Sequence, residues 1–224
     1  MIKDNIVFQA LTKYLLGLII VSLLLFVPAT SFSYWNAWLF IGLLFIPMFI
    51  FGIILIFKNQ TLLKNRLNAK EKESEQKIVI LLSAIMFISG FIIAGLNYKY
   101  NWTHISNTIV IISSIVFIIS YILYAEVLRE NTYLSRTIEV VDNQKVIDTG
   151  MYSIVRHPMY TITIILFLMI PLILGSIISF LIFLIYPFII IIRINNEEKV
   201  LKIELKGYKE YMKKVKYKLI PFIW

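Results

Sequence analysis

Five long stretches of this 224-residue chain contain no Asp, Glu, Lys, Arg or His, and they constrain its fold more than any other feature. A helix rises about 1.5 Å per residue and a bilayer core is about 30 Å thick, so roughly 20 apolar residues cross a membrane. Because hydrophobic residues make up 59% of the chain, a soluble globule would expose much apolar surface. The chain is therefore predicted to be an all-α integral membrane protein. The five stretches are 14–29, 35–57, 78–96, 105–125 and 159–192.

The last stretch is too long for one crossing, since a single helix over 159–192 would be about 51 Å long. Gly175 and Ser176 divide it into two runs, and Pro171 stands just before them. We interpret it as a tight helical hairpin, with one tilted or kinked helix as the alternative. The prediction is thus about six transmembrane helices, the last two forming the hairpin, followed by a cytoplasmic C-terminal helix.

The positive charges support this topology. With six crossings and a cytoplasmic N-terminus, every Lys and Arg except Lys99 lies on the inner side, as the positive-inside rule requires. The net charge of +9 is then a sign of orientation in a multi-pass cell membrane protein and not of nucleic-acid binding. Both termini are expected in the cytoplasm. We divide the chain into an N-terminal four-helix region, 1–125, and a C-terminal catalytic and cofactor-binding region, 126–224.

The predicted spans contain no acid, base or histidine, which argues against an ion-coupled transporter. Cysteine is absent from the chain, so thiolate catalysis and cysteine-ligated zinc are excluded, and no metal is expected. The unusual residues gather instead in segments 126–160 and 193–218. Any catalysis is therefore expected at the inner membrane surface.

The first of these segments ends in Arg156-His157-Pro158. Proline is favoured at the first position of a helix, so the fifth apolar helix is expected to begin at Pro158. His157 then lies near free backbone N–H groups, a place that favours an anion such as a carboxylate. The alternative is that Arg156 and His157 face lipid headgroups. A turn is predicted at Thr149-Gly150.

The second segment begins where the last apolar stretch ends. Arg193 and Glu197 are four residues apart and share a face if the segment is helical, whereas Glu198 lies about 100° round the helix. The alternative is a surface Arg–Glu pair on an amphipathic helix that lies on anionic lipid.

Four features occur in a fixed order: GMYSIVRHPMY at 150–160, the apolar hairpin, RINNEE at 193–198 and GYKEYMKKVKYKLIP at 207–221. Together they resemble the isoprenylcysteine carboxyl methyltransferase family, which belongs with the membrane phospholipid methyltransferases. The resemblance extends from about Asn131 to the C-terminus. The first four apolar stretches resemble the family only in being hydrophobic.

The resemblance implies S-adenosyl-L-methionine as methyl donor, bound at the cytoplasmic side. It places His157 and Tyr160 against the donor and a glutamate of the Glu197-Glu198 pair at the donor's amino group. Arg193 would face the acceptor, and Glu198 would be the base if the acceptor is an amine. Glu139 stands where relatives place a glutamine. The residues implied for the donor site are Glu139, Gln144, Lys145, Val146, Ile147, Tyr152, His157, Pro158, Met159, Tyr160 and Glu197, with Arg193 and Glu198 as catalytic residues.

The predicted function is S-adenosyl-L-methionine-dependent methyl transfer to a lipid-like or apolar small molecule that enters from the membrane lipid. Carboxyl, amine and thiol acceptors all remain open. One alternative is an NADPH-dependent membrane reductase of the sterol reductase type, because such reductases resemble this family in their C-terminal cofactor region. The other is a non-catalytic membrane scaffold whose basic tail binds anionic lipid.

Overall fold

The computed structural model describes residues 2–68, 74–135, 137–138, 140–141 and 143–224, and the described residues form helices and loops without any strand. In chain order the helices are α1 (Ile2–Ala29), α2 (Trp35–Lys58), α3 (Gln60–Leu67), α4 (Ser74–Tyr100), α5 (Asn107–Glu130), a 3-10 turn (Gly150–Ser153), α6 (Pro158–Ile173), α7 (Ile177–Phe183), α8 (Tyr186–Glu204) and α9 (Tyr208–Lys214).

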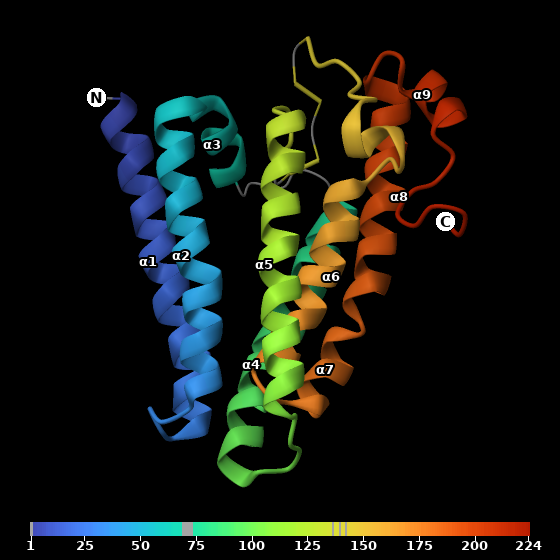
Figure 1. Ribbon diagram of the computed structural model, residues 1–224. Coiled ribbons are helices and arrows are strands. Elements are labelled where there is room, and N and C mark those ends of the chain that lie inside the picture. The colour runs from blue at the N-terminus through green and yellow to red at the C-terminus, as the bar shows by residue number, and fades with distance from the viewer. Residues whose placement is uncertain (1, 69–73, 136, 139, 142) are drawn as a thin grey trace.

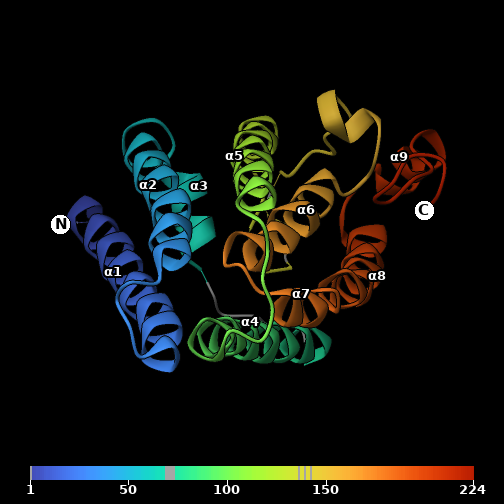
Figure 2. The same ribbon diagram turned by 60° about the horizontal axis from the view of Figure 1, so that its bottom comes forward.

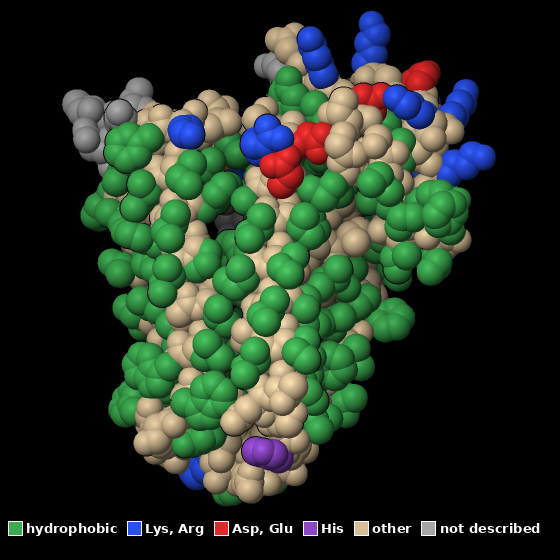
Figure 3. Space-filling model, viewed as in Figure 1, with side chains coloured by type: hydrophobic (Ala, Val, Ile, Leu, Met, Phe, Trp, Pro, Cys, Tyr) green, Lys and Arg blue, Asp and Glu red, His purple; other side chains and the backbone are tan. Residues whose placement is uncertain are grey.

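The long helices run side by side along one axis (Figure 1). Among the described residues, five helical stretches are long and apolar enough to cross a membrane, and the shorter α6 is also apolar. Many of their large hydrophobic side chains are exposed, such as Ile46 at 61% and Ile122 at 64%. Figure 3 shows these side chains covering the sides of the bundle, with most visible charged groups at its upper end. An all-α integral membrane protein is thereby confirmed.

The 159–192 stretch folds as the predicted hairpin, and the single kinked helix is wrong. Gly175 has a φ of 77°, a left-handed conformation that glycine adopts without strain, and it reverses the chain between α6 and α7. Side chains from α4 and the start of α2 hold the backbone carbonyls of this tip. The Tyr34 hydroxyl donates to Leu174 O at 2.5 Å and the Asn36 amide donates to Ile173 O at 2.7 Å.

The chain runs along the bundle an even number of times, so both termini lie in the upper half of Figure 1. This agrees with the predicted topology; the side of the membrane that this end faces stays a prediction. Seen from below, α6 lies inside the bundle, between α5 on one side and α7 and α8 on the other (Figure 2). Helix α6 packs most extensively against α5, and the side chains of its first turn, Pro158, Met159 and Tyr160, are buried.

The short helix α3 packs between the N-terminal helices and the region after α5. Leu62 and Leu63 are buried against Leu55 of α2 and Leu128 of α5. Arg66 then donates to the Ser135 carbonyl at 3.3 Å and also to the Tyr124 hydroxyl. The loop after α2 is therefore a packed element that supports the segment after α5.

Candidate active site

A pocket of about 800 Å³, partly open to solvent, lies at the end of the bundle that carries the chain termini. The wall combines the segment after α5, the first turn of α6, the polar end of α8, and α9. The lining residues are Asn131, Tyr133, Leu134, Ser135, Thr137, Ile138, Gln144, Lys145, Val146, Ile147, Tyr152, Arg156, His157, Met159, Tyr160, Arg193, Glu197, Leu201, Leu205, Tyr208 and Tyr211.

The structure brings most of the predicted site residues to this one pocket. Three do not line it. Pro158 is buried as the first residue of α6, Glu198 lies behind the pocket wall, and Glu139 is outside the described residues. The predicted residues that do line the pocket are Gln144, Lys145, Val146, Ile147, Tyr152, His157, Met159, Tyr160, Arg193 and Glu197.

Tyr160 links two of the charged groups that line the pocket, Arg193 and Glu197. Its hydroxyl accepts a hydrogen bond from Arg193 Nε at 2.6 Å and donates one to Glu197 Oε2 at 2.5 Å. The Arg193 guanidinium also lies over the Tyr160 ring, 5.7 Å from its centroid. Because Arg193 and Glu197 share a face of α8, as their spacing predicts, one phenol contacts both. The result is a chain of cation, phenol and carboxylate along the pocket wall.

A second charged group lies behind this wall. Glu198 is only 2% exposed, and its Oε1 accepts from Arg156 Nε at 2.7 Å and lies 3.2 Å from His157 Nε2. Lys218 Nζ is 3.7 Å from the other carboxylate oxygen. Arg156 and His157 are 6% and 5% exposed, so they do not face lipid headgroups. The carboxylate of Glu198 is thus enclosed by Arg156, His157 and Lys218 of the protein itself.

Arg156 also binds the segment that follows α9. Its guanidinium donates to the carbonyls of Val215 and Lys216 at 2.8 and 2.7 Å. The backbone N–H groups of Arg156 and His157 donate to the carbonyls of Tyr217 and Lys218, both at 2.9 Å. The RHP motif and the C-terminal segment therefore form one unit, although they lie about 60 residues apart in the sequence.

The predicted turn at Thr149-Gly150 is present and positions Tyr152. The Glu130 carboxylate accepts from the Thr149 hydroxyl at 2.8 Å and from the Met151 N–H at 3.3 Å. Gly150 has a φ of 49°, and a Cβ there would lie 2.2 Å from Glu130 Oε1. Glycine is required for this close approach, and the 3-10 turn that follows directs Tyr152 into the pocket.

Sequence reasoning missed the tyrosines of α9. Tyr208 and Tyr211 both line the pocket, and the Tyr211 hydroxyl donates to the Tyr152 carbonyl at 2.7 Å. The Tyr208 hydroxyl is buried without a hydrogen-bond partner, and the Tyr152 hydroxyl approaches Asn131 without forming a regular hydrogen bond. Burial raises the pKa of Tyr152 and of Tyr208, so both phenols stay protonated and able to donate. Their three-residue spacing in GYKEY was the available signal for a shared face.

Metal ligands are not clustered in the part of the chain that the structure describes: no group of three or more His, Asp or Glu side chains there is placed to hold an ion. The described pocket lining instead offers the guanidinium groups of Arg156 and Arg193, the Lys145 ammonium, the Glu197 carboxylate, an imidazole and several phenols. Such a set suits a charged organic ligand that carries both an ammonium and a carboxylate.

Comparison with known proteins agrees with this geometry. No curated protein matches the chain. The model of the isoprenylcysteine carboxyl methyltransferase (ICMT) family matches residues 108–203, less than half of the chain. The match begins near the start of α5 and ends in the last turn of α8, so it contains the RHP motif, the hairpin and both glutamates. The match confirms the resemblance that the motifs indicate: the stretch that builds most of the pocket is similar to the isoprenylcysteine carboxyl methyltransferase family.

Proposed function

We propose that this protein is an integral-membrane methyltransferase that uses S-adenosyl-L-methionine and acts on a lipid-like or apolar small molecule. The observation that carries the proposal is the Arg193–Tyr160–Glu197 chain, which lies in a pocket at the polar end of membrane-spanning helices. The family match over the same residues supports methyl transfer as the reaction.

The residues of the pocket fit the donor. Its ammonium and sulfonium groups need an anion, and Glu197 is the carboxylate on the pocket wall, with a side chain 19% exposed. Its carboxylate needs a donor, for which His157 at the start of α6 is suited. Its ribose and adenine need hydrogen-bond partners, and the Tyr208 and Tyr152 hydroxyls are buried donors without a regular partner. Leaving such groups unpaired costs about 1–3 kcal/mol each, which a polar ligand would offset.

The bound donor supplies a methyl group on a sulfonium, and the protein has to align it with the acceptor. In-line displacement gains most from orientation, so residues that fix geometry are sufficient. We propose that Arg193 orients the acceptor, by a bidentate contact if the acceptor is a carboxylate. An amine or thiol acceptor must also lose a proton.

The two neighbouring glutamates then have different roles. Glu197 lines the pocket, whereas Glu198 is enclosed by Arg156, His157 and Lys218. We therefore assign the donor contact, and the acceptance of a proton where one is released, to Glu197. Glu198, considered as the base from the sequence, becomes a positioning residue in this proposal.

An apolar acceptor is favoured because the pocket lies at the polar end of the membrane-spanning helices and has apolar side chains in its wall. Its wall includes apolar side chains from two sides, with Leu134 and Ile138 after α5 and Leu201 and Leu205 near the end of α8. A molecule with an apolar body and one polar reactive group would place the body along these residues and the reactive group at Arg193.

The test is calorimetric binding of S-adenosyl-L-methionine to the detergent-purified protein, beside NADPH. We expect saturable donor binding that His157→Ala weakens and that His104→Ala does not, since His104 lies at the opposite end of the bundle, in a separate polar depression. Tyr208→Phe should weaken donor binding without loss of thermal stability. Binding of NADPH in place of the methyl donor would refute the proposal, and binding of neither ligand to folded protein would favour a scaffold.

A further inference from the structure

The chain ends in a compact apolar loop beside the site. The backbone N–H groups of residues 218, 219 and 220 all donate to the Trp224 carbonyl, at 2.9 to 3.1 Å. This closes a loop over 220–223, here called the tail loop. Phe222 and Ile223 are 86% and 76% exposed, and Ile220 is 49% exposed. Three neighbouring apolar side chains are thus presented away from the protein by a closed backbone.

The tail loop is fixed at the height where the apolar part of α8 ends. Lys218 Nζ donates to Asn195 Oδ1 at 2.8 Å, and the Leu219 carbonyl accepts from the Thr161 hydroxyl at 2.8 Å. Asn195 follows Ile192, the last residue of the charge-free stretch, by three residues, or about 4.5 Å along a helix. The polar interface extends roughly 5–8 Å beyond the hydrocarbon core on each side. The tail loop therefore lies at the level of that interface.

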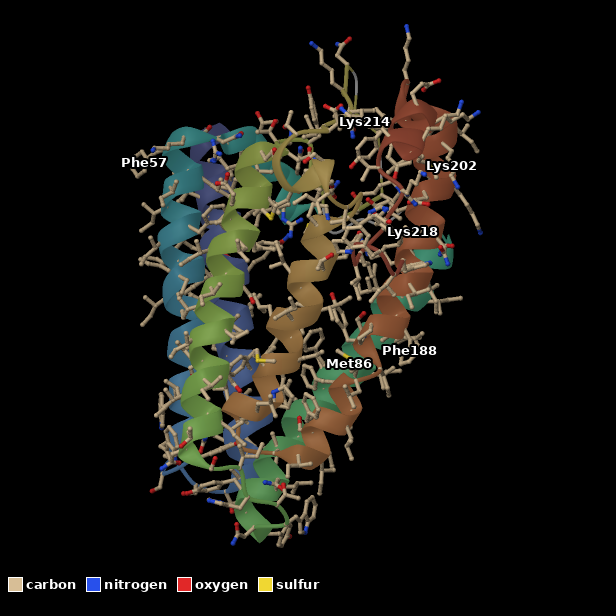
Figure 4. The ribbon with its side chains drawn as sticks, turned by 45° about the vertical axis from the view of Figure 1, so that its right-hand side comes forward. Phe57, Met86, Phe188, Lys202, Lys214 and Lys218 are labelled. Carbon is tan, nitrogen blue, oxygen red and sulfur yellow. The ribbon has the colours of Figure 1, made fainter. Side chains whose placement is uncertain are left out.

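The surroundings of the tail loop change from apolar to basic along the bundle axis. Figure 1 shows the last residues turning back from α9 along α8. In Figure 4 the labelled Lys202, Lys214 and Lys218 lie toward the upper end, whereas Phe188, which is 67% exposed, lies further down α8. Aromatic side chains accompany the loop, since the Tyr217 ring contacts Phe222 with centroids 5.3 Å apart. This order of lysine, aromatic and aliphatic groups is the one that membrane interfaces favour.

We propose that the tail loop inserts into the bilayer interface, so that its binding partner is the lipid surface. Its lipid-facing groups continue the exposed apolar surface of α8, while Lys202 and Lys214, with side chains 41% and 64% exposed, lie nearer the headgroups. The inference is independent of the proposed methyl transfer. It has a consequence for the pocket, because the carbonyls of Tyr217 and Lys218 hold the backbone N–H groups of Arg156 and His157. Anchoring the loop in lipid holds this segment against the start of α6.

The natural absence of cysteine allows a direct test. Phe222→Cys is labelled with a nitroxide in vesicles of phosphatidylcholine and phosphatidylglycerol, 3:1 being a suitable ratio. Collisions with molecular oxygen, which partitions into lipid, are compared with collisions with a water-soluble nickel chelate. Lys209→Cys, on the exposed side of α9, is the aqueous control. Leu181→Cys, 59% exposed on α7, is the deep reference.

The label at 222 is expected to collide more with oxygen than with nickel, at a depth between those of the two controls. Nickel access equal to that at 209 would overturn the proposal. Shielding from both reagents would also overturn it, because a protein surface such as a second copy would then cover the loop. For the coupling to the pocket, Phe222→Ser with Ile223→Ser should speed hydrogen exchange of the Arg156 and His157 amides severalfold in the same vesicles. Unchanged exchange would refute that coupling.

Discussion

Replacing Glu197 and Glu198 separately by glutamine is the sharpest test of the assigned roles. Glutamine has nearly the same shape as glutamate, so each change removes a charge and little else. The two residues are adjacent in the sequence, yet one faces the pocket and the other is enclosed behind it. We expect Glu198→Gln to lower stability and Glu197→Gln to lower donor affinity.

The magnitudes follow from the contacts. Removing one partner of a buried ion pair costs about 3–5 kcal/mol. The lower end applies to Glu198, because Lys202 and Lys218, with side chains 41% and 20% exposed, can turn to solvent, which leaves mainly Arg156 uncompensated. At roughly 2–4 °C per kcal/mol for a chain of this size, a loss of about 3 kcal/mol lowers Tm by roughly 6–12 °C.

Glu197→Gln keeps an acceptor for the Tyr160 hydroxyl, so its cost is closer to the 1 kcal/mol of an ordinary hydrogen bond, or roughly 2–4 °C. The donor, in contrast, loses a charge-assisted contact of about 1.5–3 kcal/mol, which weakens binding roughly ten- to hundredfold. Thermal unfolding and calorimetry on the same detergent samples measure both quantities. The reasoning is refuted if Glu198→Gln keeps its Tm while donor affinity falls, or if Glu197→Gln binds donor normally.

Two further changes test the supports of the pocket. Gly150→Ala should lower the free energy of unfolding by about 2 kcal/mol, since alanine is strained at a φ of 49° and its Cβ displaces Glu130. The control is Gly52→Ala, where a Cβ meets nothing within 4 Å and no loss of stability is expected in thermal unfolding. The Lys214 hydrogen bond lowers the pKa of Asp148 in the folded protein. Their ion pair therefore adds stability above the pKa that Asp148 has in the unfolded chain, near 3.9, and this contribution is lost as the pH falls through the pKa of Asp148 in the folded protein. Asp148→Asn should therefore lower Tm slightly at pH 7 and not at all below the folded pKa; an equal difference at both would contradict the assignment.

The sequence predicts the membrane-spanning part well because the physical constraint there is strong. A charge inside hydrocarbon is so costly that charge-free stretches coincide with the helices, and Gly175 marks the only reversal that fits the length of 159–192. The contact between Arg156 and the Val215 carbonyl is different, because it joins residues 59 apart that no periodic pattern relates. The packing of α3 could not be predicted either. Its buried leucines lie in a strongly polar stretch, and such a stretch looks the same in the sequence as a solvated connector.

The geometry of α8 explains why two glutamates stand side by side. Successive residues on a helix point about 100° apart, so Glu197 and Glu198 face different surroundings although one bond of the chain separates them. Glu197 shares its phenol partner with Arg193, where a ligand can compete for either charge. Glu198 has its charge compensated by Arg156, which also holds the C-terminal segment through the Val215 and Lys216 carbonyls. A pocket that binds and releases an ionic donor needs one carboxylate, Glu197, that can form and break its contact with the donor. The second carboxylate, Glu198, keeps its contacts within the protein and so holds the surrounding segments in position. For this reason a double substitution would confound loss of binding with loss of structure, and only the single changes can separate the two.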